Sequence, residues 1–149
     1  MDHDKRISFL GCNLDNLDAD ESIKFIDSRI SKGIFTQHVV VNVAKLINMR
    51  KDKELYTSVN NCDLINVDGM GVLWGANLLG HKIKERVAGI DLFADLLKLS
   101  ENKNYPIFLL GSRKNIIERT NQIISNGYPH LIIAGYHHGY FWEEEEKIV

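Results

Sequence analysis

The chain has 149 residues, a formal net charge of −2, and 44% hydrophobic and 26% charged residues. This length suits one domain with a single core, and the composition excludes a disordered chain, a collagen-like repeat and a coiled coil. A net charge near zero provides no broad basic face, so no nucleic-acid partner is expected. No apolar run approaches the roughly 20 residues that span a bilayer, and the polar N-terminus lacks the apolar core of a signal peptide. Cys12 and Cys62 have no CxxC spacing and are expected to be reduced thiols of a cytoplasmic protein.

The first predicted elements are a strand and a helix. A β-rich run at residues 6–10 stops at Gly11. The helix that follows has a capping-box spacing at its N-terminus, Asp18 with Glu21, and its C-terminus is expected at Gly33.

Strand-like and helical patterns then alternate to the end of the chain. Further strands are predicted at residues 38–41, 63–67, 106–110 and 131–134. Further helices are predicted at residues 43–60 (in two pieces divided near residue 51), 70–79, 89–102 and 113–125. Continuous apolar strands separated by helices are typical of a parallel sheet covered on both faces. The sequence therefore predicts an α/β fold, a single domain over residues 1–149 with a Rossmann-like, mostly parallel sheet and helices on both faces.

Polar and glycine residues follow four of the predicted strands. In open α/β sheets, ligands bind beyond the carboxyl ends of the strands, close to the helices that follow. These four strand ends should meet at one edge of the sheet, which predicts a ligand site there. They are Gly11-Cys12-Asn13, Asn42, Asp68-Gly69-Met70-Gly71 and Gly111-Ser112-Arg113.

Each candidate residue at these ends has a functional and a structural interpretation. Asp68 is either a general base or a turn aspartate, and Asn42 is either a pocket residue or only a helix N-cap. Gly111 and Ser112 either bring backbone N–H groups to a diphosphate or form a plain turn with Ser112 as the cap. Arg86, in a polar loop, either binds phosphate through its forked guanidinium or is solvated.

Other motifs disfavour cofactor chemistry. The glycines at 69 and 71 lack the third glycine of a dinucleotide fingerprint, which disfavours a nicotinamide-dependent enzyme. Asp18-Ala19-Asp20 has the form of a metal-binding DxD, but it begins a helix, where capping explains it better. The adjacent His137 and His138 would point to opposite faces of an extended segment, so they are not expected to bind one metal. No metal or other cofactor is expected.

The stretch from Val41 to Leu92, VNVAKLINMRKDKELYTSVNNCDLINVDGMGVLWGANLLGHKIKERVAGIDL, closely resembles the WecG/TagA/CpsF glycosyltransferases, glycosyltransferase family 26. The similarity continues through PIFLLGS (106–112) and GYHHGYF (135–141), and its most specific part is NVDGMGV followed by ERVAGIDL. The resemblance implies an inverting enzyme at the cytoplasmic membrane face. Such an enzyme moves N-acetylmannosamine or its uronic acid from a UDP-sugar to a polyprenyl-diphosphate-linked acceptor, in cell-surface polysaccharide or teichoic acid synthesis.

The resemblance also implies roles for individual residues. Asp68 is implied to be the catalytic base, Asn42 to lie in the substrate pocket, and Arg86 to contact a substrate phosphate. A base suits the acceptor hydroxyl, and a cation or N–H donors suit the leaving UDP. The remaining implied substrate-binding residues are Gly69, Gly111, Ser112, Tyr136 and His138.

The chain departs from the family in two places. Val40 stands where family members commonly have threonine, which removes a hydroxyl from the expected pocket. Family chains also continue past GYHHGYF into a further strand and a basic appendage, so a C-terminally truncated domain is expected here. The full-length protein would then contact the membrane surface through the missing region, as a peripheral protein at the inner face. An edge left exposed by the truncation would favour a homo-oligomer, and the alternative function is a catalytically incomplete UDP-sugar-binding remnant.

Overall fold

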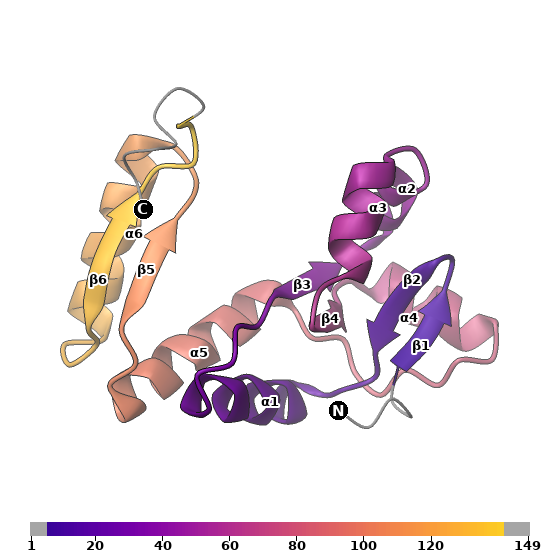
Figure 1. Cartoon of the computed structure of the whole chain (residues 1–149), viewed down its shortest axis with the longest axis horizontal. Coiled ribbons are helices and arrows are strands. Elements are labelled where there is room, and N and C mark those ends of the chain that lie inside the picture. The colour runs from indigo at the N-terminus through magenta and orange to yellow at the C-terminus, as the bar shows by residue number, and fades with distance from the viewer. Residues whose placement is uncertain (1–5, 142–149) are drawn as a thin grey trace. The chain divides into compact units, whose positions relative to one another are not determined.

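A computed structural model describes residues 6–141 (Figure 1). The chain folds as two compact units, Met1–Phe93 and Ala94–Val149, called unit 1 and unit 2 below. The single domain expected from the length stays a prediction. Within residues 6–141, no helix combines the length and the apolar character needed to cross a membrane.

Strands and helices alternate, as predicted. The strands are β1 (Arg6–Phe9), β2 (Cys12–Asp15), β3 (His38–Val41), β4 (Leu64–Val67), β5 (Ile107–Leu110) and β6 (Ile133–His137). The helices are α1 (Ala19–Ser31), α2 (Val43–Met49), α3 (Lys53–Asn60), α4 (Met70–Leu78), α5 (Gly89–Lys103) and α6 (Lys114–Gly127). The α/β class is confirmed. The strands pair two by two, β1 with β2, β3 with β4 and β5 with β6, where the sequence predicted one continuous sheet.

The first strand end is a hairpin turn and not a strand-to-helix junction. β1 and β2 pair antiparallel, with Phe9 opposite Cys12, so that Leu10 and Gly11 form a two-residue loop (Figure 1). Both loop residues have positive φ, 51° and 83°, as the tightest hairpin turns require. The expected strand-to-helix junction is therefore wrong, while the expectation that Gly11 to Asn13 belongs to the ligand edge stays a prediction. The hairpin escaped prediction because leucine rarely adopts positive φ.

The parallel pair β3–β4 lies at the centre of unit 1. Its register pairs His38 with Leu64 and Val41 with Val67, and all four residues of β4 are buried. β2 lies beside β4, where the buried Asp15 carboxylate accepts a hydrogen bond of 2.8 Å from the Ile65 N–H. The core around this pair comprises Phe9, Cys12, Leu14, Val41, Leu46, Met49, Val59, Ile65, Val67, Val72, Ala76 and Ile83.

The predicted helix ends of unit 1 are confirmed. Asp18 caps α1 through a capping box with Glu21, and Gly33 follows its C-terminus at φ 63°. The long helical pattern after β3 does divide into α2 and α3, because Asp52 accepts hydrogen bonds from the Glu54 and Leu55 N–H groups and begins a new helix.

Unit 2 consists of most of α5, the parallel pair β5–β6 and α6. α6 lies against both strands (Figure 1). Its core contains Leu97, Leu109, Ile117 and Ile124. β6 lies two to three residues later than predicted, because the apolar run before it only partly overlaps the segment that pairs with β5.

Candidate functional site

Asp68 directly follows the buried strand β4. Its N–H donates to the Val41 carbonyl at 2.9 Å, so the β3–β4 ladder continues one step beyond Val67. Gly69 then takes φ 99°, a backbone conformation that residues other than glycine rarely adopt. Helix α4 begins at the next residue, Met70. The turn leaves the Asp68 side chain 29% exposed at the carboxyl end of the parallel pair.

Arg86 reaches the same point from a segment that is distant in sequence. The next residue, Val87, is buried and donates its N–H to the Val67 carbonyl at 2.8 Å, which fixes this segment beside the end of β4. The Arg86 Nη1 atom lies 4.0 Å from the Asp68 Oδ1 atom. This distance exceeds the roughly 3 Å of a hydrogen bond, so both partly exposed groups retain capacity to bind a ligand.

Asn42 stands at the end of β3, next to this pair. Its Oδ1 atom accepts a 2.9 Å hydrogen bond from the Lys45 N–H, so the N-cap interpretation is confirmed. A Cβ added to Gly69 would lie 3.9 Å from the Asn42 Cβ, which shows how closely the two strand ends approach. Because the cap uses the Asn42 oxygen, a ligand would meet the side-chain NH₂ group as a donor.

The structure thus brings together four of the predicted residues in unit 1: Asn42, Asp68, Gly69 and Arg86. They offer a proton acceptor, a guanidinium and an amide donor. The N-terminus of α4 adds backbone N–H groups, because Gly69 provides no side-chain cap. Such a set can accept a proton from a hydroxyl while it neutralises an anionic group. In the part of the chain that the structure describes, no three His, Cys, Asp or Glu side chains are grouped as metal ligands would be.

The other predicted residues form a second group in unit 2. Gly111 and Ser112 follow β5 with φ 138° and 61°, and the Gly139 N–H donates to the Ser112 carbonyl at 2.9 Å. A Cβ on Gly139 would lie 3.1 Å from the Gly111 backbone, so the two loops touch through their main chains. Arg113, not Ser112, is the N-cap of α6, and no side chain caps this helix. The interpretation of Ser112 as the cap is therefore wrong.

Tyr136 lies on β6, and His138 directly follows this strand. Tyr136 is 43% exposed, and the Tyr140 N–H donates to the His138 Nδ1 atom at 3.2 Å. The rings of His137 and His138 lie 4.3 Å apart, tilted by 38°. The expectation that they point to opposite faces is wrong, because β6 ends at His137 and the strand alternation ends with it. Since the two groups belong to different units, the convergence of the ends of β4 and β5 stays a prediction.

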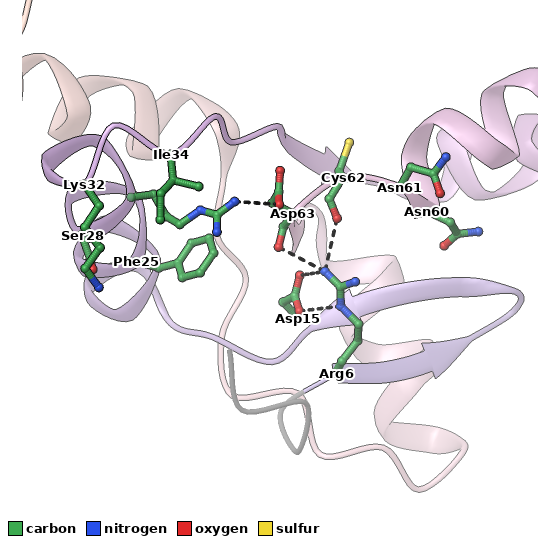
Figure 2. A pocket seen from close by; sticks show the side chains of 11 residues that line it. Arg6, Asp15, Phe25, Ser28, Lys32, Ile34, Asn60, Asn61, Cys62 and Asp63 are labelled. Carbon is green, nitrogen blue, oxygen red and sulfur yellow. Dashed lines mark hydrogen bonds and ion pairs between the residues drawn. The ribbon is translucent and has the colours of Figure 1, made fainter.

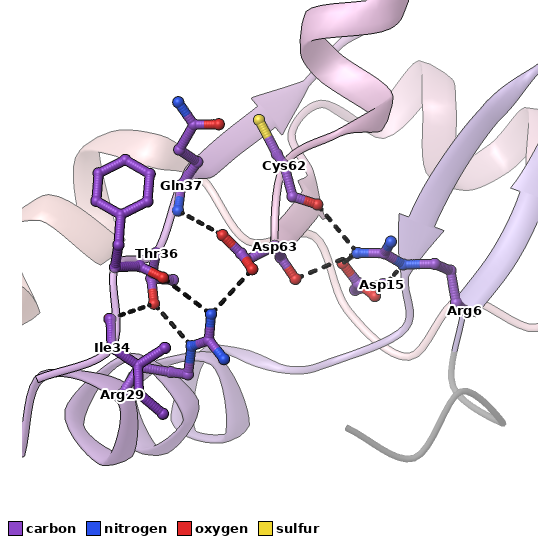
Figure 3. A network of polar contacts seen from close by, with 9 residues as sticks. Arg6, Asp15, Arg29, Ile34, Thr36, Gln37, Cys62 and Asp63 are labelled. Atoms are coloured by element: carbon purple, nitrogen blue, oxygen red, sulfur yellow. Dashed lines mark hydrogen bonds and ion pairs between the residues drawn. The ribbon is translucent and has the colours of Figure 1, made fainter. Parts of the chain in front are cut away.

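A cavity lies at the other end of β4, beside the residues that precede this strand. It has a volume of about 620 Å³ and is lined by polar and apolar side chains, mainly from β1, β2, α1 and the segment before β4 (Figure 2). Its charged side chains bind one another: Arg6 donates to both Asp15 oxygens at 2.8 and 2.9 Å, and Arg29 donates to Asp63 at 3.0 Å (Figure 3). Arg6 also donates to the carbonyls of Cys62 and Asp63.

These pairings make the cavity part of the scaffold. Asp15 is 2% exposed, and its hydrogen bonds raise the pKa of Arg6. The Gln37 N–H binds the second Asp63 oxygen, so this carboxylate joins α1 to the segment before β3. The sequence interpretation missed this network. The available signal was Asp15, a carboxylate at the end of the short run CNLD.

Comparison with known proteins supplies the family. The model of the glycosyl transferase WecG/TagA/CpsF family matches residues 7–149. A protein of Bacillus subtilis (strain 168), named N-acetylglucosaminyldiphosphoundecaprenol N-acetyl-beta-D-mannosaminyltransferase, is 33% identical over 78% of this chain and 44% of its own length. Proteins with the same name from Bacillus spizizenii and Staphylococcus aureus (strain NCTC 8325) are 27% and 28% identical, over 95% and 97% of this chain and 53% and 57% of their own lengths. The chain therefore spans about half the length of these relatives. On the match over residues 7–149, the chain belongs to the glycosyl transferase WecG/TagA/CpsF family.

Proposed function

We propose that this chain carries the catalytic centre of an inverting glycosyltransferase. The enzyme moves an N-acetylmannosamine-like sugar from a UDP-sugar to a polyprenyl-diphosphate-linked acceptor, in cell-surface polysaccharide or teichoic acid synthesis. The observation that carries the proposal is the placement of Asp68 and Arg86 4.0 Å apart at the carboxyl end of the β3–β4 pair. The names of the relatives support the acceptor class and the transferred sugar.

In the proposed reaction, Asp68 accepts the proton of the acceptor hydroxyl as its oxygen attacks the anomeric carbon of the donor. The bond between that carbon and the UDP oxygen breaks, and its electron pair leaves with UDP. Attack opposite to the leaving group inverts the configuration at the anomeric carbon. Arg86 and the N-terminus of α4 neutralise a phosphate of the substrates.

The remaining residues bind substrate. Asn42 donates a hydrogen bond from its NH₂ group to a sugar, and Gly69 allows close approach because it has no side chain. On the nucleotide side we assign Gly111, Ser112, Tyr136 and His138, whose loops are joined by backbone contacts within unit 2. No divalent cation takes part. The enzyme acts as a peripheral protein at the cytoplasmic face of the membrane.

The test is transfer from UDP-N-acetylmannosamine to a short-chain diphosphate-linked acceptor. Asp68→Asn should lower turnover by about 10²–10⁴-fold and leave UDP affinity unchanged, because it removes only the proton acceptor. Asp20→Asn, an exposed carboxylate in the first turn of α1, is the matched control. Unchanged turnover in Asp68→Asn would remove this residue from the mechanism. Loss of UDP binding in EDTA, with recovery on adding Mg²⁺ or Mn²⁺, would contradict the cation-free mechanism.

One observation favours the alternative of a UDP-sugar-binding remnant without turnover. Val40 offers no hydroxyl, and its Cγ2 atom would lie 3.2 Å from a Cβ added to Gly89, at the start of α5. Calorimetric titration with UDP-N-acetylmannosamine discriminates the two functions. A remnant binds the donor but transfers nothing to any polyprenyl-diphosphate acceptor, and Val40→Thr would then be the first variant in which to seek recovered turnover.

A further inference from the structure

An apolar surface adjoins the candidate site in unit 1. It is formed by the tip of the β1–β2 hairpin, by α2 and by α4, and we call it the α2–α4 face. Its members are exposed although most are apolar: Trp74 is 64% and Leu78 87% exposed, and Leu10, Val43 and Ile47 each about half. The residues that define the face are Leu10, Val43, Ile47, Arg50, Trp74 and Leu78.

The sequence of α4 explains why this face is apolar. The helix reads MGVLWGANL, with Asn77 as its one polar side chain, but it buries only Val72 and Ala76. Helices that are apolar all round normally lie within a protein core or in contact with lipid. This one leaves Met70, Trp74 and Leu78 exposed in the part of the chain that the structure describes.

Two glycines of α4 shape the face. A Cβ on Gly71 would lie 2.8 Å from the Val43 Cγ2 atom, and one on Gly75 would lie 3.4 Å from the Phe9 ring. Because these two glycines have no side chains, α2 and the hairpin can pack close to α4. Between them lies an apolar pocket of about 190 Å³, with Arg50 among its lining residues.

The two segments that form the face carry cations and no carboxylate, although Asp52, Asp68 and Glu85 flank them in sequence. Residues 43–51 contain Lys45, Arg50 and Lys51 and no carboxylate, and residues 69–84 contain Lys82 and Lys84 and no carboxylate. The chain as a whole has a net charge of −2, so these two segments are more cationic than the chain on average. Lys84 is paired with Glu21 and Lys45 with a carbonyl, which leaves Arg50, Lys51 and Lys82 as the cations for a partner. An exposed apolar strip bordered by cations complements an anionic lipid surface.

We propose that the α2–α4 face rests on an anionic bilayer, with Trp74, Leu78 and Ile47 inserted at the boundary between headgroups and acyl chains. The role that we assign to this contact, which is to bring the site to a membrane-anchored acceptor, rests on the proposed function. α2 begins after Asn42 and α4 after Gly69, so docking through these helices holds the Asp68–Arg86 pair beside the headgroup layer. A diphosphate-linked acceptor is anchored in that layer.

The test follows the fluorescence of Trp74 in a Trp142→Phe background, where Trp74 is the single tryptophan of the chain. Vesicles of phosphatidylglycerol and phosphatidylcholine should shift its emission to shorter wavelength, and brominated acyl chains should quench it. Vesicles of phosphatidylcholine alone should bind at least tenfold more weakly. Leu78→Glu and Ile47→Glu, both at exposed positions that tolerate a charge, should each lower binding about tenfold or more.

Ile123→Glu is the matched control, since Ile123 is 61% exposed on α6, outside the face. Equal vesicle binding by Leu78→Glu and the parent chain would overturn the proposal, as would an unshifted Trp74 emission. A shift that depends on protein concentration without lipid would also overturn it, because a second copy would then cover the face. Leu78→Glu should still transfer sugar to a water-soluble acceptor at the parent rate. Failure of that transfer in every variant, with vesicle binding intact, would refute the proposed function and not the docking surface.

Discussion

Asp68 and Arg86 show how backbone hydrogen bonds place two side chains that are 18 positions apart in sequence. The bond from the Asp68 N–H to Val41 and the bond from the Val87 N–H to Val67 hold both segments at one strand end. The side chains themselves stay 4.0 Å apart and partly exposed. A surface pair at this distance adds little to stability, so its placement is better explained by ligand binding.

Arg86→Ala should therefore weaken substrate engagement without unfolding the chain. Loss of one charge-assisted phosphate contact predicts a rise in the substrate KM of about 10- to 100-fold, with a smaller change in kcat. Arg86→Lys keeps the charge but not the forked geometry and should recover part of the loss. Steady-state kinetics of both variants check this. Parent-like KM values in Arg86→Ala would mean that the guanidinium is only solvated.

The two thiols are expected to react at very different rates. Burial is the main cause that raises the pKa of Cys12 to about 11, and this side chain is fully buried. Burial also raises the pKa of Cys62, but Cys62 is only half-buried. Because the thiolate is the reactive form, iodoacetamide at a pH of about 8 should label Cys62 and spare Cys12 in the folded chain. Mass spectrometry of labelled peptides tests this, with guanidinium-unfolded protein as the control in which both react.

At the scale of elements, the close approach of α2 to α4 depends on a missing side chain. Gly71 faces Val43 at a distance that no Cβ can occupy. The same helix begins after Gly69, which has a positive φ. Gly69 therefore determines where α4 starts, and Gly71 determines how closely it packs against α2. The packing requirement was not visible in the sequence, where these glycines resembled half of a dinucleotide-binding motif.

Gly71→Ala should destabilise the chain by about 1–3 kcal/mol, because the added methyl group overpacks the α2–α4 contact. Gly127→Ala is the matched control, since nothing lies within 4 Å of its Cβ position at the end of α6. It should be neutral or stabilise the chain by up to about 1 kcal/mol, as alanine favours a helix. Urea unfolding measures both, and equal stabilities of the two variants would contradict the packing argument.

At the scale of the molecule, unit 1 contains a buried polar chain that joins β3, β4 and α1. The His38 Nε2 atom and the Asn66 Oδ1 atom are 2.9 Å apart, and Asn66 donates to the Ser22 hydroxyl, which in turn donates to the Asp18 carbonyl. Asn66 and Ser22 are fully buried. Such a satisfied network fixes how the elements pack, because any shift leaves a buried group unpaired.

This network predicts a loss of stability in mild acid. Burial lowers the pKa of His38 below its usual 6.5, an effect reinforced by Lys45 and opposed by the Asn66 bond and by Asp15. The unfolded chain therefore takes up a proton that the folded chain refuses, so the free energy of unfolding should fall as the pH drops below about 6.5. Urea unfolding at pH values of about 7.5 and 5.5, on either side of the ordinary histidine pKa, should show a smaller fall for His38→Gln than for the parent. The exposed His130→Gln should behave like the parent, and an unchanged slope in His38→Gln would contradict this assignment.

The sequence by itself determined what depends on neighbours along the chain. The caps at Asp18 and Asn42, the division near Asp52 and the polar ends of β3, β4 and β5 are local features, and the structure has them where the patterns predicted. The family resemblance likewise rests on contiguous motifs. Periodicity and capping need only residues within about one helical turn or one strand, so they can be read without the fold.

The tertiary structure alone decided what depends on distant partners. It revealed the packing of the β1–β2 hairpin beside β4 and the network of Asp15 with Arg6, which reaches the carbonyls of Cys62 and Asp63. It also placed Arg86 next to Asp68 and left apolar side chains of α4 exposed in the part of the chain that is described. Each of these depends on which segments pack together in three dimensions, and residue order carries no local signal for such contacts.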